Sequence, residues 1–199
     1  MIPEAYRKII TEHGAPGFTP EELVVAGAAN RALPAPKFYN RIIEPLIVAN
    51  LLRARMIARG AHGLNVHAAY RATGGAARSA HKVNEALDLD LLPADVKVFR
   101  GRGENLREIY AEESVILWME HGAKYNIGLG HYGAKGSLAT FRCHIDTTGC
   151  RSWQHAGRSV VRPSSVITIA NRLIIEGRFK CLPNHHTGRC AGEAEEDET

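Results

Sequence analysis

Hydrophobic residues return at helical spacing over several long stretches of the chain. Between Phe38 and Arg59 they recur every three or four positions, which predicts a long amphipathic helix ended by Gly60. The same spacing predicts helices over residues 4–13, 20–31 and 105–120. Residues 164–175 are rich in apolar side chains and fit either a helix or a strand, because periodicity does not separate the two there.

Shorter stretches have the pattern of β-strands. They cover residues 64–69, 85–91, 96–100, 126–129 and 138–145. A glycine-rich loop is expected over residues 72–79. Helices followed by a mixed series of short strands are typical of an α+β fold. We therefore expect a small, largely antiparallel sheet with flanking helices.

Length and composition are those of an ordinary globular protein. The 199 residues, of which 45% are hydrophobic and 23% charged, suffice for one domain with a core. We expect a helical segment over residues 1–37, the main domain over 38–180 and a polar, disordered tail over 181–199. The net charge of +4 is modest, so no nucleic-acid partner is expected.

The chain also carries no pattern that predicts export or membrane insertion. No stretch approaches the about 20 apolar residues that a membrane-spanning helix needs. Residues 1–14 are charged and lack the apolar region of a secretory signal, so we expect the protein in the cytoplasm of the producing cell. Its four cysteines are then expected as reduced thiols or metal ligands rather than disulfides.

Two histidine–aspartate pairs have the clearest chemistry. His81 and Asp88 are separated by seven positions, and His144 and Asp146 by two. Strand alternation would place Arg142, His144 and Asp146 on one face. Two histidines and one aspartate are a known ligand set of catalytic zinc sites, which keep a fourth position open to water. The alternative is two surface pairs that bind no metal.

The segment from Ser79 to Asp88 resembles a family signature. Its pattern, Ser79-x-His81-x-x-Asn84-x-Ala86-x-Asp88, is similar to the S-x-H-x-x-G-x-A-x-D motif of the LAS-type zinc peptidases. That family includes D-Ala-D-Ala carboxypeptidases, L-alanyl-D-glutamate endopeptidases and many bacteriophage endolysins. Four of the five fixed positions match, and Asn84 stands where the family has glycine. Asparagine tolerates a left-handed backbone better than most residues, so the turn can be kept.

Two further regions add to the resemblance. Tyr70-Arg71 and Gly74-Gly75-Ala76 are similar to the family's Y-R and G-G-A elements. Residues 141–146 resemble the strand that carries the third zinc ligand in the smaller phage-type members, as do the residues that follow, Gly149 and Trp153. The similarity covers about residues 38–153.

The resemblance implies a zinc centre with three protein ligands. His81, Asp88 and His144 would bind one zinc ion, with a water molecule as the fourth ligand. Arg71 matches the family's arginine, which implies a cation that stabilises the oxyanion of the reaction. Ser79 would fix the start of the His81 loop or hydrogen-bond a group behind the ligands.

The family's general base has no direct counterpart in this sequence. Relatives carry a glutamate, or in some branches a histidine or aspartate, just before the third ligand, whereas residues 139–143 contain no acid. Asp146 is the first candidate, because it is the nearest carboxylate on the predicted face of His144. His131 is the second, because the turn around it is expected to fold back toward the strand.

The expected function is hydrolysis of a peptide bond in the peptidoglycan stem. A monomeric zinc peptidase of this kind would act on the cell wall after release, as a phage lysis enzyme, or as a virion component. The missing acid leaves an alternative, a non-catalytic metal-binding or virion-structural domain of the same fold. One further cluster fits either a second metal site or an unstructured tail: Cys181, His185, His186 and Cys190.

Overall fold

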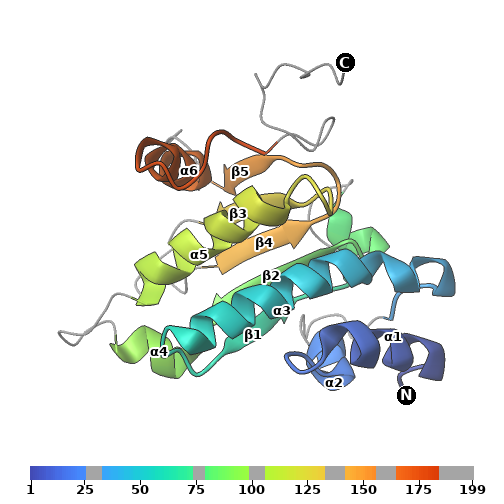
Figure 1. The fold of residues 1–199 in the computed structure, drawn as a ribbon. Coiled ribbons are helices and arrows are strands. Elements are labelled where there is room, and N and C mark those ends of the chain that lie inside the picture. Colours follow the sequence, from blue (N-terminus) through green and yellow to red (C-terminus); the bar gives the residue numbers. More distant parts are fainter. Residues whose placement is uncertain (26–32, 74–78, 99–105, 133–141, 156–164, 184–199) are drawn as a thin grey trace, which may run out of the picture.

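A computed structural model describes residues 1–25, 33–73, 79–98, 106–132, 142–155 and 165–183 (Figure 1). Its helices and strands follow one another in an α+β arrangement, as expected. In chain order they are α1 (Glu4–Gly14), α2 (Pro20–Val25), the 3-10 helix η1 (Pro36–Ile42), α3 (Ile43–Ala58), β1 (Leu64–Ala68), the 3-10 helix η2 (Ala80–Val83), β2 (Ala86–Leu91), α4 (Pro93–Val98), α5 (Leu106–His121), β3 (Gly128–Tyr132), β4 (Arg142–Asp146), β5 (Ser152–His155) and α6 (Ser165–Ile175). No helix in these ranges is both long and apolar enough to cross a membrane.

One sheet organises the described part of the chain. Its strands lie in the order β1-β2-β4-β3-β5. The pairs β1–β2, β2–β4 and β4–β3 are antiparallel, whereas β5 runs parallel to β3. The prediction of a small, largely antiparallel sheet with flanking helices is therefore confirmed.

Alternation gives this sheet two chemically different faces. Along β2, the leucines at 87, 89 and 91 project to one side and Asp88 and Asp90 to the other, because successive strand side chains point in opposite directions. The register of β2 with β4 extends both sets. We call one side the helical face, with Leu87, Leu89, Cys143 and Ile145. The other is the polar face, with Asp88, Asp90, Arg142, His144 and Asp146.

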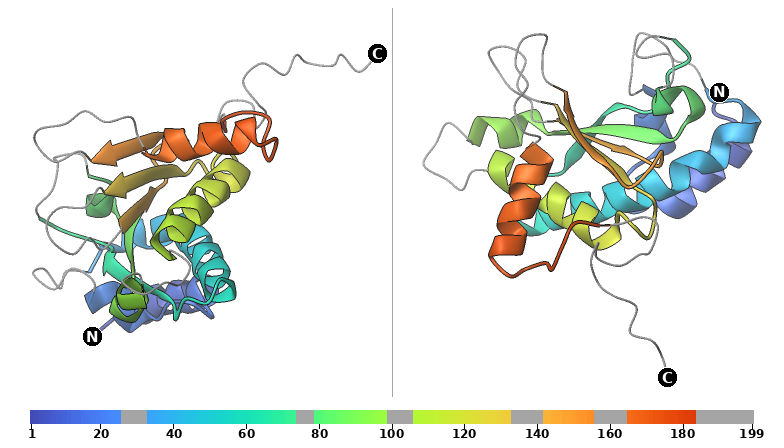
Figure 2. Two further views of the ribbon diagram at one scale, coloured as in Figure 1. Left: turned by 90° about the vertical axis from the view of Figure 1, so that its left-hand side faces the viewer. Right: turned by 90° about the horizontal axis from the view of Figure 1, so that it is seen from above.

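Helices α3, α5 and α6 cover the helical face. All three lie on the same side of the sheet in Figure 2. The Tyr110 hydroxyl of α5 donates to the Leu89 carbonyl at 2.9 Å and lies 3.0 Å from the Cys143 sulfur. Burial raises the pKa of Cys143 to about 12. The thiol therefore stays protonated and packs as a small apolar group.

The N-terminal helices share this hydrophobic core. Tyr6 and Ile10 of α1 are buried in one cluster with Leu46 of α3, and Phe18 and Leu23 belong to the same cluster. The described part of residues 1–37 is thus packed onto the main domain.

Several elements differ from the sequence-based predictions. The helix predicted from Phe38 begins earlier, as η1 at Pro36, because proline is favoured in the first helical turn. Residues 96–100, predicted as a strand, overlap helix α4, which Pro93 begins in the same way. The apolar stretch 164–175 forms helix α6, and β5 had no clear signal in the sequence. Parts of several predicted elements lie outside the described residues: 26–31, 74–78, 99–100, 105, 138–141, 164 and 184–199.

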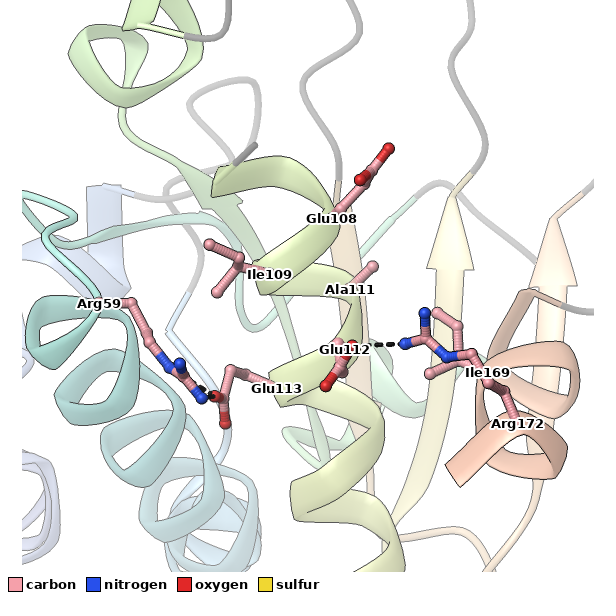
Figure 3. Close-up of a pocket in the computed structure, with 8 residues that line it drawn as sticks. All are labelled: Arg59, Glu108, Ile109, Ala111, Glu112, Glu113, Ile169 and Arg172. Atoms are coloured by element: carbon pink, nitrogen blue, oxygen red, sulfur yellow. Dashed lines mark hydrogen bonds and ion pairs between the residues drawn. The ribbon is translucent and has the colours of Figure 1, made fainter. Parts of the chain in front are cut away.

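A pocket of about 480 Å³ lies in the helix layer (Figure 3). Arg59, Glu112, Glu113 and Arg172 are among the residues that line it. Arg59 pairs with Glu113 at 2.8 Å and Arg172 pairs with Glu112, so these charges neutralise one another. Because the pocket is formed by helices on the helical face, it does not belong to the polar face.

His131 lies on the helical face of the sheet. The register of β3 sets His131 opposite Cys143 and Gly130 opposite His144. The His131 side chain is fully buried, with Nε2 2.9 Å from the Ser114 hydroxyl of α5. The expectation that a turn carries His131 back to the metal ligands is therefore wrong. Residues 130–132 continue the strand, and alternation turns the imidazole toward the core.

This placement predicts a pH dependence of stability. Burial lowers the pKa of His131 to about 3, against about 6.5 in an unfolded chain. Between these values the unfolded chain binds a proton that the folded protein excludes. The contribution of neutral His131 to the free energy of unfolding is thus fully present above pH 6.5 and is lost as the pH falls toward 3. His131→Gln cannot take up this proton.

Urea unfolding at pH 7 and pH 5 tests this expectation. The free energy of unfolding should fall by about 1–2 kcal/mol more in the wild type than in His131→Gln over that interval. Equal pH dependence of the two proteins would contradict the buried, neutral imidazole.

Candidate metal centre

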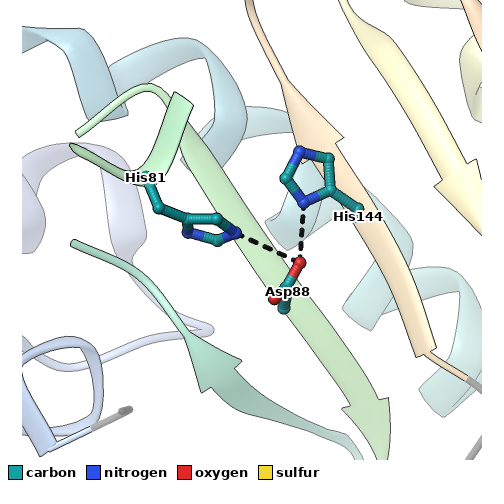
Figure 4. Close-up of side chains that lie close together, drawn as sticks. All are labelled: His81, Asp88 and His144. Carbon is teal, nitrogen blue, oxygen red and sulfur yellow. Dashed lines mark hydrogen bonds and ion pairs between the residues drawn. The ribbon is translucent and has the colours of Figure 1, made fainter. Parts of the chain in front are cut away.

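The three residues predicted as zinc ligands come together in the structure. His81 of η2, Asp88 of β2 and His144 of β4 are buried, and one ligand atom of each lies within 4.8 Å of the others. Figure 4 shows both imidazoles directed at one carboxylate oxygen. Asp88 Oδ1 is 3.3 Å from His81 Nε2 and 2.7 Å from His144 Nδ1. Segments that are distant in sequence thus converge on one point.

Each imidazole is oriented by a hydrogen bond from its other nitrogen. His81 Nδ1 lies 2.6 Å from the Ala69 carbonyl, which can only accept, so we assign the proton to Nδ1. His81 Nε2 is then a lone pair toward Asp88, and it is buried without a hydrogen-bond partner. A buried nitrogen in this state is costly, and a bound cation would satisfy it.

His144 is oriented by a carboxylate instead of a carbonyl. Its Nε2 lies 3.1 Å from Asp146 Oδ2, on the opposite side of the ring from the nitrogen that faces Asp88. A carboxylate behind a ligating histidine fixes the ring and raises its basicity. Asp146 therefore stands where it can orient His144.

The charges of the cluster favour a cation at its centre. Burial, the largest influence, lowers the pKa of His144, but hydrogen bonds to Asp146 and Asp88 outweigh it and raise that pKa. Burial likewise raises the pKa of Asp88, yet the hydrogen bond from His144 and the nearby His81 imidazole hold it well below its usual range. The centre therefore attracts a positive charge. A metal ion would displace the His144 proton, as metal binding to imidazole generally does.

The donor set fits a transition-metal ion. Two imidazole nitrogens and one carboxylate oxygen suit zinc, and three protein ligands leave a coordination position open. The same set also suits iron(II), so the ligands by themselves indicate a metal centre but not which metal occupies it.

Asp146 itself is held by several donors. Its Oδ1 accepts from the Thr148 amide at 2.9 Å and from the Thr148 hydroxyl at 2.6 Å, and its Oδ2 lies 3.3 Å from Arg151 Nη2. Burial raises the pKa of Asp146, but hydrogen bonds with His144 and Thr148 outweigh it and bring the pKa to about 2. So weak a base, facing the far side of His144, is poorly placed to accept a proton from water at the centre.

Arg71 borders the cluster as expected. Its Nη2 lies 3.9 Å from Asp88 Oδ2, and its Nε is buried without a hydrogen-bond partner. Its backbone amide donates to the His81 carbonyl at 3.1 Å, which ties the Arg71 segment to η2. Ser79 precedes η2 in extended backbone and its carbonyl accepts from Lys82 at 2.9 Å, but its side chain makes no capping hydrogen bond.

Asn84 ends the turn that carries His81. Its φ of 62° and ψ of 32° are left-handed, a conformation that glycine adopts readily and asparagine tolerates. The side-chain amide of Asn84 also forms hydrogen bonds with two distant segments. Asn84 Oδ1 accepts from the Tyr6 hydroxyl of α1 at 3.1 Å, and Nδ2 donates to the Phe38 carbonyl at 3.0 Å. The N-terminal helix thus holds the end of η2.

Three further side chains meet on the polar face beside the cluster: His67, Asp90 and Arg142. The sequence predicts no functional role for His67 or Asp90. Arg142 Nε and Nη2 donate to both oxygens of Asp90, at 2.7 and 2.9 Å. His67 of β1 places Nδ1 3.3 Å from Asp90 Oδ2. Alternation along 85–91 and 138–146 already set Asp90 and Arg142 on the side of Asp88. His67 had no such signal, because the register of β1 depends on an irregularity between Val66 and Ala68.

The C-terminal cluster is described only in part. Cys181 is disulfide-bonded, so its sulfur is not a free thiolate ligand, contrary to the expectation of reduced cysteines. Cys143 and Cys150 are free thiols. His185, His186 and Cys190 lie outside the described residues.

Comparisons with protein-family models, with curated proteins and with solved structures found no match to this chain. The site is therefore interpreted from its own residues.

The hydrogen bonds of Asn84 predict that α1 contributes to metal binding. Asn84→Gly keeps the left-handed turn but removes the side-chain hydrogen bonds of Asn84, and Tyr6→Phe removes only the hydroxyl. Each should weaken Zn²⁺ binding by about tenfold, because groups that orient metal ligands typically contribute that much. Competition with a chelator of known affinity measures the change.

Tyr39→Phe is the matched control, because the Tyr39 ring stacks on Tyr6 at 4.8 Å between centroids but its side chain does not bond Asn84. Unchanged affinity in both Tyr6→Phe and Asn84→Gly would show that α1 has no part in the centre.

Proposed function

We propose that the protein is a zinc-dependent peptidase that hydrolyses a peptide bond in the peptidoglycan stem. The observation that carries the proposal is the buried convergence of His81, Asp88 and His144, with one unpartnered nitrogen facing the centre. The signature from Ser79 to Asp88 supports the same conclusion, because its ligand positions are the residues that converge.

Zinc is the ion that best suits this centre and this signature. When bound by three protein ligands, zinc lowers the pKa of a water molecule to about 7 and polarises a carbonyl group. The chain's own residues prepare for that chemistry. Ala69 and Asp146 orient the two imidazoles, and Asp88 stays ionised beside them.

Arg71 is the residue that we propose to stabilise the developing negative charge. Its guanidinium lies at the edge of the cluster, and its buried Nε has no acceptor. Such a guanidinium can donate to a carbonyl oxygen that gains negative charge during hydrolysis. The ion pair with Asp88 at 3.9 Å is too long for a hydrogen bond, so no hydrogen bond to Asp88 is lost when Arg71 turns to a substrate.

The proposal extends to where the protein acts and on which partner. We propose a monomer that reaches the wall after release from the producing cell, as a phage lysis enzyme, or that acts as a virion component. Its partner would be the stem peptide, with no role for nucleic acid. The second candidate is a non-catalytic metal-binding or virion-structural domain. What favours it is that His131 faces the core and Asp146 is saturated with donors.

The zinc content and murein hydrolysis of the purified protein test the proposal together. The wild type should hold about one zinc per chain and release muropeptides, whose masses identify the bond that is cut. His81→Ala should lose both properties, because two ligands rarely retain zinc. His121→Ala, which changes a histidine at the end of α5, is the matched control.

Stoichiometric zinc with no hydrolysis of any murein would leave the non-catalytic domain. Absence of zinc from both the wild type and metal-reconstituted protein would overturn the metal centre itself.

A further inference from the structure

His67 and Asp90 form a histidine–carboxylate pair on the polar face. His67 Nδ1 lies 3.3 Å from Asp90 Oδ2, and Arg142 holds both oxygens of Asp90 in place. A carboxylate beside Nδ1 favours the tautomer with the proton on that nitrogen, which leaves Nε2 as a proton acceptor. The pair therefore has the composition of an oriented general base.

The sheet register sets this pair next to the metal centre. Ala68 pairs with Asp88 and Val66 with Leu89, so His67 occupies the irregular position between them. It is thus beside the peptide that carries the Asp88 ligand. Asp90 follows Asp88 by two residues on the same face. The His67 side chain is 47% exposed, so water and substrate can reach it.

The other candidates on this face are excluded by their contacts. Asp146 is bound by Thr148 and Arg151 behind His144. Asp90 is occupied by the two-point contact with Arg142. Tyr132 stays protonated near neutral pH, because burial raises its pKa to about 12. Among the described residues of the polar face, His67 alone combines an exposed imidazole with a carboxylate beside its Nδ1.

We propose that His67, oriented by Asp90, is the general base and acid of the hydrolysis; this rests on the proposed peptidase function. His67 Nε2 takes one proton from a water molecule as the water oxygen bonds to the carbonyl carbon and the carbonyl π electrons move onto oxygen. When the C–N bond breaks, its electron pair goes to nitrogen, which takes the proton from His67 as the carbonyl re-forms. One amine and one carboxylic acid result, and His67 is neutral again.

The charges around His67 agree with a neutral base. Burial is the largest influence and lowers the pKa of His67. Arg142 and Arg71 lower it too, while Asp90 and Asp88 raise it. The net pKa is below the ordinary histidine value, so Nε2 is available at neutral pH.

His67→Gln tests the assignment through activity. We expect the variant to keep its zinc and its unfolding midpoint, because the side chain is half exposed and does not ligate the metal. Its kcat on murein should fall about 100-fold or more, and the acidic limb of its pH–rate profile should disappear. His62→Gln is the matched control. His62 Nδ1 also bonds a buried aspartate, Asp95 at 2.6 Å, but on the loop between α3 and β1.

A second readout does not depend on activity. Imidazole nitrogen shifts in NMR spectra of the wild type should show His67 with the proton on Nδ1 at neutral pH. Asp90→Asn should shift the population toward Nε2–H. A wild-type ring with its proton on Nε2 would overturn the orientation by Asp90.

The outcomes separate this proposal from the one on which it rests. If the zinc-loaded wild type hydrolyses murein and His67→Gln retains the activity of His62→Gln, His67 is not the base and the peptidase function stands. If the zinc-loaded wild type does not hydrolyse murein, the peptidase function and the role of His67 are both overturned.

Discussion

The candidate metal centre depends on the pairing of Asp88 with His144 across two neighbouring strands. These residues lie directly opposite each other in the β2–β4 register, and Asp88 Oδ1 is 2.7 Å from His144 Nδ1. A shift of β4 by one residue would turn His144 to the helical face, because strand side chains alternate. The core residues that fix the register, Leu89 and Cys143 among them, thereby also fix the ligands. Packing on the helical face therefore determines the positions of the ligands on the polar face.

That arrangement brings several ionisable groups into a buried layer, which is costly unless each charge is paired. Each aspartate of the polar face has a cationic neighbour. Arg142 binds Asp90, Arg151 binds Asp146, and Arg71 approaches Asp88. Asp88 is the least well neutralised of the three, since its arginine is 3.9 Å away and its closer partners are imidazoles. The shortage of positive charge is thus concentrated where a metal ion would bind.

Much of this could be predicted from the sequence, and the successes and failures have physical causes. The helical pattern over Phe38–Arg59 and the alternation around His144 are local signals, so the fold class and the ligand faces followed from them. His131 failed because whether a glycine-flanked stretch turns or continues as a strand is decided by pairing with β4. His67 was missed for a similar reason, since an irregular register in β1 places it beside Asp90. The hydrogen bond of Asn84 with Tyr6 could not be predicted, because the two residues are 78 positions apart and no local sequence pattern links them.

The buried polar atoms that lack partners indicate which ligands the candidate centre could satisfy. Four such side-chain atoms occur in the described part of the chain, and two of them, His81 Nε2 and Arg71 Nε, belong to this site. The first is a lone pair that needs a cation, and the second is an N–H that needs an acceptor. A single bound cation would satisfy His81 and leave Arg71 unpaired. A cation with an anionic oxygen attached would satisfy both, because the oxygen would be held between the ion and the guanidinium. Both residues lie beside Asp88, so the site combines a place for a cation with a donor for an anionic ligand.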